Sequence, residues 1–95
     1  MTAAIRTERR DTFKIDLSGA FIRRTDLSNA NLKGANLSGA DCANVNFRGA
    51  NLQDAILDGT NLRGADLTGA RNLTRSQLQR AIIDDQTILP AEFAE

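Results

Sequence analysis

The chain has 95 residues, which is the length of a single domain. Twelve Lys and Arg residues balance twelve Asp and Glu residues, so no bulk charge favours nucleic acid or an acidic membrane surface. The absence of histidine excludes Ser-His and Cys-His nucleophilic pairs within this chain, and the single Cys42 cannot close an intrachain disulfide. Because no stretch is apolar enough for a membrane span or a signal peptide, we expect a cytoplasmic protein.

Residues 1–14 form an N-terminal segment that is rich in charge and poor in large apolar side chains. Only Ile5 and Phe13 could cover an apolar face of the element that follows. Either this segment is a partial cap, or that end of the domain meets another chain, and the sequence leaves both alternatives open.

Residues 15–69 consist of eleven consecutive five-residue units without insertion or deletion. The first position is small or β-branched, and the second is Asp or Asn in all units except those of Phe21 and Ile56. All seven glycines of the chain occupy the fifth position. The third position, called the centre below, is apolar throughout. The predicted structural core is made of these centres: Leu17, Ile22, Leu27, Leu32, Leu37, Cys42, Phe47, Leu52, Leu57, Leu62 and Leu67.

A period of five excludes a helix, because apolar residues five apart drift by about 140° around it. In an extended chain the side chains alternate between two faces, so the first position and the centre point inward while the second and fourth point outward. An odd spacing would invert the next unit, so the chain must turn once per unit. The turn is predicted near the fifth position, where Gly, Asn and Asp tolerate positive φ. The units therefore wind into a coil, and the periodicity alone does not give its number of sides.

The tandem A-(D/N)-L-x-x units resemble the pentapeptide-repeat family over residues 15–69. The resemblance implies an all-β fold, a right-handed quadrilateral β-helix with four units per coil, and hence about three coils. It also implies a bacterial source and a structural or protein-interaction role. Some members of the family resemble duplex DNA and occupy topoisomerases such as gyrase.

Residues 70–95 are predicted to form a C-terminal cap, because the five-residue phase breaks after Ala70. Thr74 and Gln77 have the spacing of a capping box that opens a short helix at about 74–80. Leu73 and Leu78 are expected to face the last coil, residues 81–90 to return to the stack, and the tail after them to fray.

The sequence predicts no catalytic, cofactor-binding or metal-binding residues. Cys42 is interpreted as a small buried apolar residue, and the second-position carboxylates as hydrogen-bond acceptors for nearby backbone rather than metal ligands. Phe21 and Ile56 are candidate partner contacts, because each points outward where Asp or Asn is expected. Arg23, Arg24 and Arg63 are interpreted as a solvated part of the wall.

We therefore expect a non-catalytic structural or protein-interaction module with an unknown protein partner and no assignable biochemical activity. The alternative is a DNA mimic that binds a topoisomerase such as gyrase, which the short length and neutral charge disfavour; nucleic acid itself and membranes are also disfavoured as partners. A further hypothesis is self-association through the N-terminal coil end. The charge layout agrees with it, since residues 1–24 sum to +3 and residues 81–95 to −4.

Overall fold

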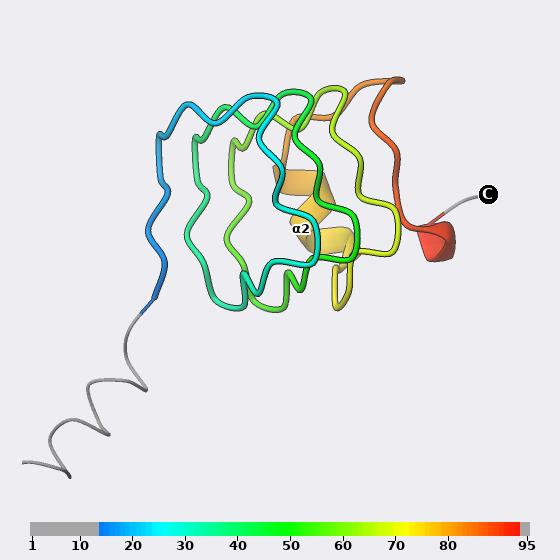
Figure 1. The fold of residues 1–95 in the computed structure, drawn as a ribbon, viewed down its shortest axis with the longest axis horizontal. Coiled ribbons are helices and arrows are strands. Elements are labelled where there is room, and N and C mark those ends of the chain that lie inside the picture. Colours follow the sequence, from blue (N-terminus) through cyan, green and yellow to red (C-terminus); the bar gives the residue numbers. More distant parts are fainter. Residues whose placement is uncertain (1–13, 94–95) are drawn as a thin grey trace, which may run out of the picture.

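The protein is described by a computed structural model over residues 14–93, and its chain winds into a stack of coils (Figure 1). Each coil is twenty residues long, because second-position residues form parallel bridges with residues twenty positions further along. Examples are Asp16 with Asn36, Phe21 with Asp41 and Asn31 with Asn51. Four five-residue units therefore make one coil, which gives the body four walls.

Each corner of a coil is a turn, and its fifth-position residue has a left-handed backbone conformation. All eleven fifth positions have φ between 59° and 72°. Seven of them are glycine and three are Asn or Asp, the residue types that reach this region at least cost. The remaining one, Arg24 with φ 59°, was not foreseen, because nothing in a lone arginine signals a left-handed backbone. The turn is closed by the next first-position amide, as where Ala20 N donates to Leu17 O at 3.1 Å.

Asp and Asn recur at the second position because their side chains hold the turn that follows. Oδ1 of Asp16 accepts a hydrogen bond from the backbone N–H of Ser18 at 3.0 Å, and Asn36 does the same with Ser38. This bond is present at every second position occupied by Asp or Asn between residues 16 and 66. Such side-chain bonds to the backbone two residues ahead are a local alternative to strand pairing and favour a bend.

The interior is filled by centre and first-position side chains. Eight of the eleven centres are buried, from Leu32 to Leu67. Leu17, Ile22 and Leu27 of the first coil pack against this core but are only partly buried. The one buried polar side chain among the described residues, Thr60, donates its hydroxyl to Leu37 O at 2.7 Å.

Helix α2, Arg75–Arg80, continues the wall of residues 55–59, where Gly59 N donates to Arg80 O at 2.8 Å, and Figure 1 shows it behind the green and yellow coils. Its N-cap is Thr74, and the capping box between Thr74 and Gln77 is present as the sequence indicates. Nε2 of Gln77 also donates to Leu52 O and Ala55 O, both at 2.8 Å. Leu73, which precedes the helix, and Leu78, which belongs to it, are both buried. Gln77 thus supplies a donor to Ala55 O, a first-position carbonyl of the kind that the next coil satisfies elsewhere, whereas Leu52 O also accepts from Ala55 N at 3.1 Å.

The segment after α2 returns to the stack through two bridges, Asn61 with Ile82 and Asp66 with Ile88. The bridges place both isoleucines at second positions, so they point outward and are 38% and 51% exposed. The inward contacts come instead from Ala81 and Leu89.

The expected frayed tail is ordered in part. A short 3-10 helix, η1, spans Ala91–Phe93 after the buried Pro90. Phe93 is partly buried, with the guanidinium of Arg75 5.8 Å from its ring centroid, and this packing explains the order. Residues 1–13 and 94–95 lie outside the described part of the chain, and with them nearly all of the expected N-terminal cap.

Candidate interaction surface

Phe21 is the most exposed large apolar side chain among residues 14–93, at 88%. Its backbone is fixed by the neighbouring coil, since Asp41 N donates to Ala20 O at 2.8 Å and Ile22 N donates to Asp41 O at 3.0 Å. A phenyl ring cannot accept the side-chain bond that Asp or Asn provides at this position. The residue therefore gives up a turn contact and places an aromatic ring in solvent on a rigid support.

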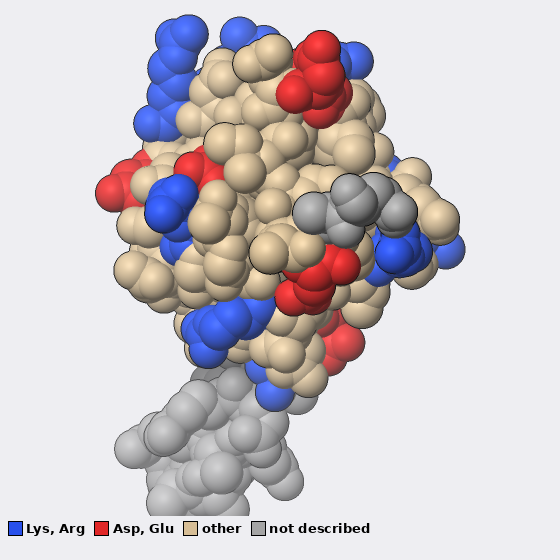
Figure 2. All heavy atoms as spheres, turned by 90° about the vertical axis from the view of Figure 1, so that its right-hand side faces the viewer, with Lys and Arg blue, Asp and Glu red and all other residues tan. Residues whose placement is uncertain are grey.

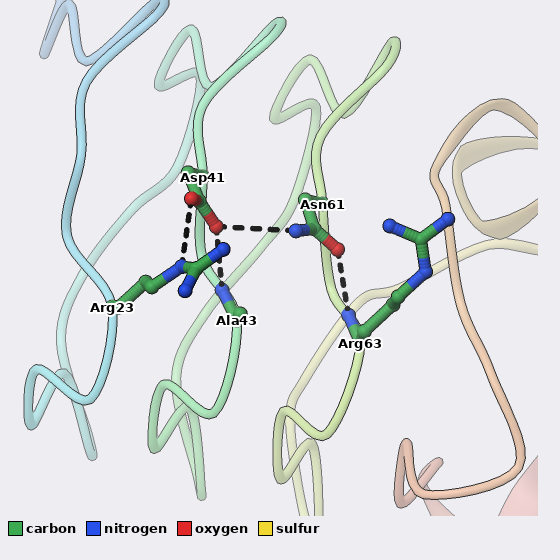
Figure 3. A network of polar contacts seen from close by, with 5 residues as sticks. All are labelled: Arg23, Asp41, Ala43, Asn61 and Arg63. Carbon is green, nitrogen blue, oxygen red and sulfur yellow. Dashed lines mark hydrogen bonds and ion pairs between the residues drawn. The ribbon is translucent and has the colours of Figure 1, made fainter.

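The wall that carries Phe21 consists of residues 20–24, 40–44, 60–64 and 81–85, and is called the Phe21 wall below. Along it, Arg23 Nε donates to Asp41 Oδ2 at 2.8 Å. Asp41 Oδ1 accepts from Asn61 Nδ2 at 3.1 Å, and Asn61 Oδ1 accepts from the backbone N–H of Arg63 at 3.1 Å (Figure 3). These bonds join three successive coils and stiffen the surface beside Phe21.

The electrostatics of Asp41 follow from this network. Desolvation acts to raise the pKa of Asp41, but the hydrogen bond from Ala43 N and the bond and charge of Arg23 together lower the pKa below its ordinary value. Asp41 therefore carries its charge at neutral pH and keeps the Arg23 side chain in place. Because Arg23 is 63% exposed, the ion pair itself stabilises the fold little.

The Phe21 wall is hollowed between Arg23 and Arg63, where the fourth-position residue is the small Ala43. The hollow has a volume of about 300 Å³, and Asn44 and Asn61 also line it. It is open to solvent and polar. It suits a side chain from a partner surface better than an enclosed small molecule.

Ile56, the second candidate contact, is 45% exposed and lies on a different wall, in the column of Asp16 and Asn36. The structure therefore does not bring Phe21 and Ile56 together. Ile82 does share the column of Phe21, at the other end of the stack. The sequence did not reveal Ile82 as outward-facing, because the break in phase after Ala70 hides the register of the returning segment.

Cys42 lies in the core with 0% exposure. Burial, followed by the charge of Asp41, raises the pKa of the Cys42 thiol to about 12. A thiol with so high a pKa is a poor nucleophile and a poor metal ligand, so Cys42 acts by packing.

The second-position carboxylates are spread along the walls. Asp26 and Asp66 are separated by Asn46 in one column, and each accepts a bond from its own turn. Within residues 14–93 no group of three or more Cys, Asp or Glu side chains could hold a metal ion. No helix in that part of the chain is long and apolar enough to cross a membrane.

Charges of both signs alternate on the surface. Figure 2, which faces the C-terminal end of the stack, shows Lys and Arg side chains interspersed with Asp and Glu around a larger area of other residues. Arg80 and Asp58 also form an exposed ion pair on the surface, at 3.3 Å. The face in Figure 2 carries no continuous field of one sign.

A family model described as pentapeptide repeats matches residues 14–41 and 46–85 in eight copies. No curated protein matches the chain. Among solved structures, the chain is similar to the pentapeptide repeat protein Rfr23 from the cyanobacterium Cyanothece 51142, with 35% identity and a TM-score of 0.71 over 81% of this chain and 52% of that one.

Two further solved structures are similar over 81% of this chain. HetL, a pentapeptide repeat protein involved in heterocyst differentiation regulation from Nostoc sp. strain PCC 7120, is 26% identical with a TM-score of 0.53, over 46% of its own length. QnrB1, a plasmid-mediated fluoroquinolone resistance protein, is 17% identical with a TM-score of 0.68, over 36% of its length, which is a likeness of fold alone. The chain thus spans about half or less of these relatives.

Proposed function

Because the chain belongs to the pentapeptide-repeat family, we propose that it is a non-catalytic module that binds another protein through the Phe21 wall. The observation that carries the proposal is the 88% exposure of Phe21 at a position that the repeat fills with Asp or Asn. The right-handed sense of the coil is part of the same inference from the family.

A protein is the partner that best suits this surface. Aromatic side chains and arginine are enriched at protein interfaces, and Phe21 has Arg23 and Arg24 two and three residues away on the same wall. The backbone is held by bonds to the next coil, so little conformational entropy is lost when the ring is covered. The adjoining hollow at Ala43 offers space for a side chain of the partner.

The test is affinity capture with the intact chain and two matched variants, Phe21→Asn and Ile56→Asn. Each substitution restores a residue that the repeat itself uses, so each variant should fold at least as well as the parent. We expect Phe21→Asn to lose a captured protein that Ile56→Asn retains. Two results would refute the proposal that the Phe21 wall binds the partner. One is equal capture by the parent and Phe21→Asn, and the other is capture that is lost only in Ile56→Asn.

The DNA-mimic alternative has no specific support in the described residues. A mimic of duplex DNA needs an extended acidic surface, whereas the Phe21 wall carries Arg23, Arg24 and Arg63 and the whole chain is neutral. We expect no effect of micromolar protein on DNA supercoiling by gyrase. Protection or inhibition in that assay would reinstate the alternative.

A further inference from the structure

The two ends of the coil stack differ in how their backbone groups are satisfied. In the second coil, Asn36 N donates to Ile15 O and Asp41 N donates to Ala20 O, both at 2.8 Å. Among the described residues, the corresponding amides of the first coil have no acceptor. These unpaired amides belong to Asp16, Phe21, Asp26 and Asn31.

The apolar interior is also least covered at this end. The centres Leu17, Ile22 and Leu27 are partly buried, and Ile15 is 37% exposed. An edge with unpaired backbone beside apolar side chains is a template for pairing with another strand.

The C-terminal end is closed by contrast. Gln77 donates to Leu52 O and Ala55 O, and Thr87 Oγ1 donates to Leu62 O at 2.8 Å. Helix α2 buries Leu78 against the last coil. Within residues 14–93, the asymmetry leaves the N-terminal end as the less covered one.

The arrangement of the unpaired backbone N–H and C=O groups indicates the direction of a strand that could pair with the first coil. In each ladder, a second-position residue directs both its N–H and its C=O toward the preceding coil, as Asp41 does toward Ala20 and Ile22. Two residues that each present both groups pair with one another in an antiparallel ladder. Within the chain, the parallel neighbour on this side of a coil is always the preceding repeat coil. The repeat register extended upstream would place Arg10 at an inward first position and Thr12 at a centre, so the repeat does not continue there.

We propose that two copies of this chain pack head to head through their first coils, related by a two-fold axis perpendicular to the stack. This goes beyond the proposed function, because it concerns the coil end and a second copy of the chain rather than the Phe21 wall and another protein. Each second-position residue of one copy pairs antiparallel with a second-position residue of the other. The centres of the two first coils then cover one another.

Charge fixes the register of this pairing. An axis through the middle of a wall sets carboxylates opposite one another, as Asp16 against the second copy's Asp16 or Asp26. An axis through a corner sets Asp16 and Asp26 against Phe21 or Asn31 instead. Because like charges directly opposite destabilise a strand pair, the corner arrangement is the one proposed.

The expected dimer is weak, because it brings together two N-terminal ends whose residues 1–24 each carry a net charge of +3. A coil about 20 Å on a side offers roughly 400 Å² per copy, or about 800 Å² in total, which is less than a stable specific interface usually buries. Two backbone bonds per pair over four walls would add up to about eight hydrogen bonds. Dissociation in the micromolar range is therefore expected, with a dimer populated at several hundred micromolar.

Sedimentation velocity of the intact chain from about 10 to 500 μM tests the proposal with the variants Phe21→Ala and Phe21→Pro. Both remove the ring, but only proline removes the N–H and blocks the edge. We expect Phe21→Ala to dimerise and Phe21→Pro to raise the dissociation constant at least tenfold. The two proposals can be told apart with the same variants. The proposed function expects both variants to lose a captured partner, whereas this proposal expects only Phe21→Pro to lose dimerisation.

Amide hydrogen exchange of the unaltered chain gives a second readout that does not depend on the folding of a variant. We expect the amides of Asp16, Phe21, Asp26 and Asn31 to exchange more slowly at high than at low protein concentration. A monomer at 500 μM, equal dimerisation of the two variants, or growth beyond two copies, which indicates head-to-tail stacking, would each overturn the inference.

Discussion

The closure of the C-terminal end can be tested at Gln77, whose amide donates to Leu52 O and Ala55 O while its Oε1 accepts from Thr74 N at 2.8 Å. In the variant Gln77→Glu the acceptor is kept, but both donors are replaced by a carboxylate oxygen that faces two carbonyls. Loss of two hydrogen bonds costs about 2 kcal/mol, and repulsion adds about 1 kcal/mol. We expect the free energy of unfolding to fall by about 3 kcal/mol at pH 7.

The measurement is urea unfolding followed by circular dichroism, with Gln77→Met as the matched control. Methionine also loses the donors but brings no charge. The two carbonyls raise the pKa of the introduced carboxyl in the folded state above its unfolded value near 4.3, so its protonated form is favoured by folding. The stability of Gln77→Glu relative to Gln77→Met should therefore rise as the pH falls through the folded pKa. A difference between the two variants that does not change with pH would refute the placement of this side chain.

Four further results are expected. Leu37→Asp should prevent folding by placing an unpaired charge on the coil axis, and a soluble variant with an unchanged circular dichroism spectrum would contradict the packing. Gly39→Ala should cost about 1 kcal/mol in urea unfolding for its positive φ alone, and Gly64→Ala should cost more because the added methyl meets a neighbouring asparagine side chain. The Cys42 thiol should react with a disulfide reagent only in urea, and fast labelling of the native chain would show that it is accessible. The hydrogen bond from the Thr68 side chain lowers the pKa of Asp66 in the folded state, so this carboxylate stabilises the fold above about pH 4 and ceases to do so as the pH falls. The variant Asp66→Asn should therefore lose less stability between neutral and acidic pH than the parent in acid titrations.

The fold was predictable to the extent that it depends on local sterics. A turn once per unit follows from period five, and positive φ at the fifth position follows from the placement of all seven glycines. Inward centres follow from strand alternation, and Leu37 and Leu57 are buried as that alternation requires. The capping box of Thr74 and Gln77 was readable because it spans only four residues.

The candidate surface was predictable only in part. Phe21 and Ile56 stand out in the sequence as departures from Asp or Asn, but only the register of the coil places them on different walls. Ile82 and Ile88 did not stand out, because beyond Ala70 the five-residue count no longer tells which side chains face inward.

The five-residue bend can be derived from the sequence alone, as can the inward and outward positions and the residues that hold each corner. All of these depend on interactions within a few residues, which a repeated pattern displays directly. The tertiary structure sets which residues stack and how the returning segment is registered. It also gives Arg24 its left-handed backbone and, among the described residues, leaves the first coil less covered than the last. These depend on hydrogen bonds and contacts between residues about twenty positions apart, and a pattern of period five carries no signal at that distance.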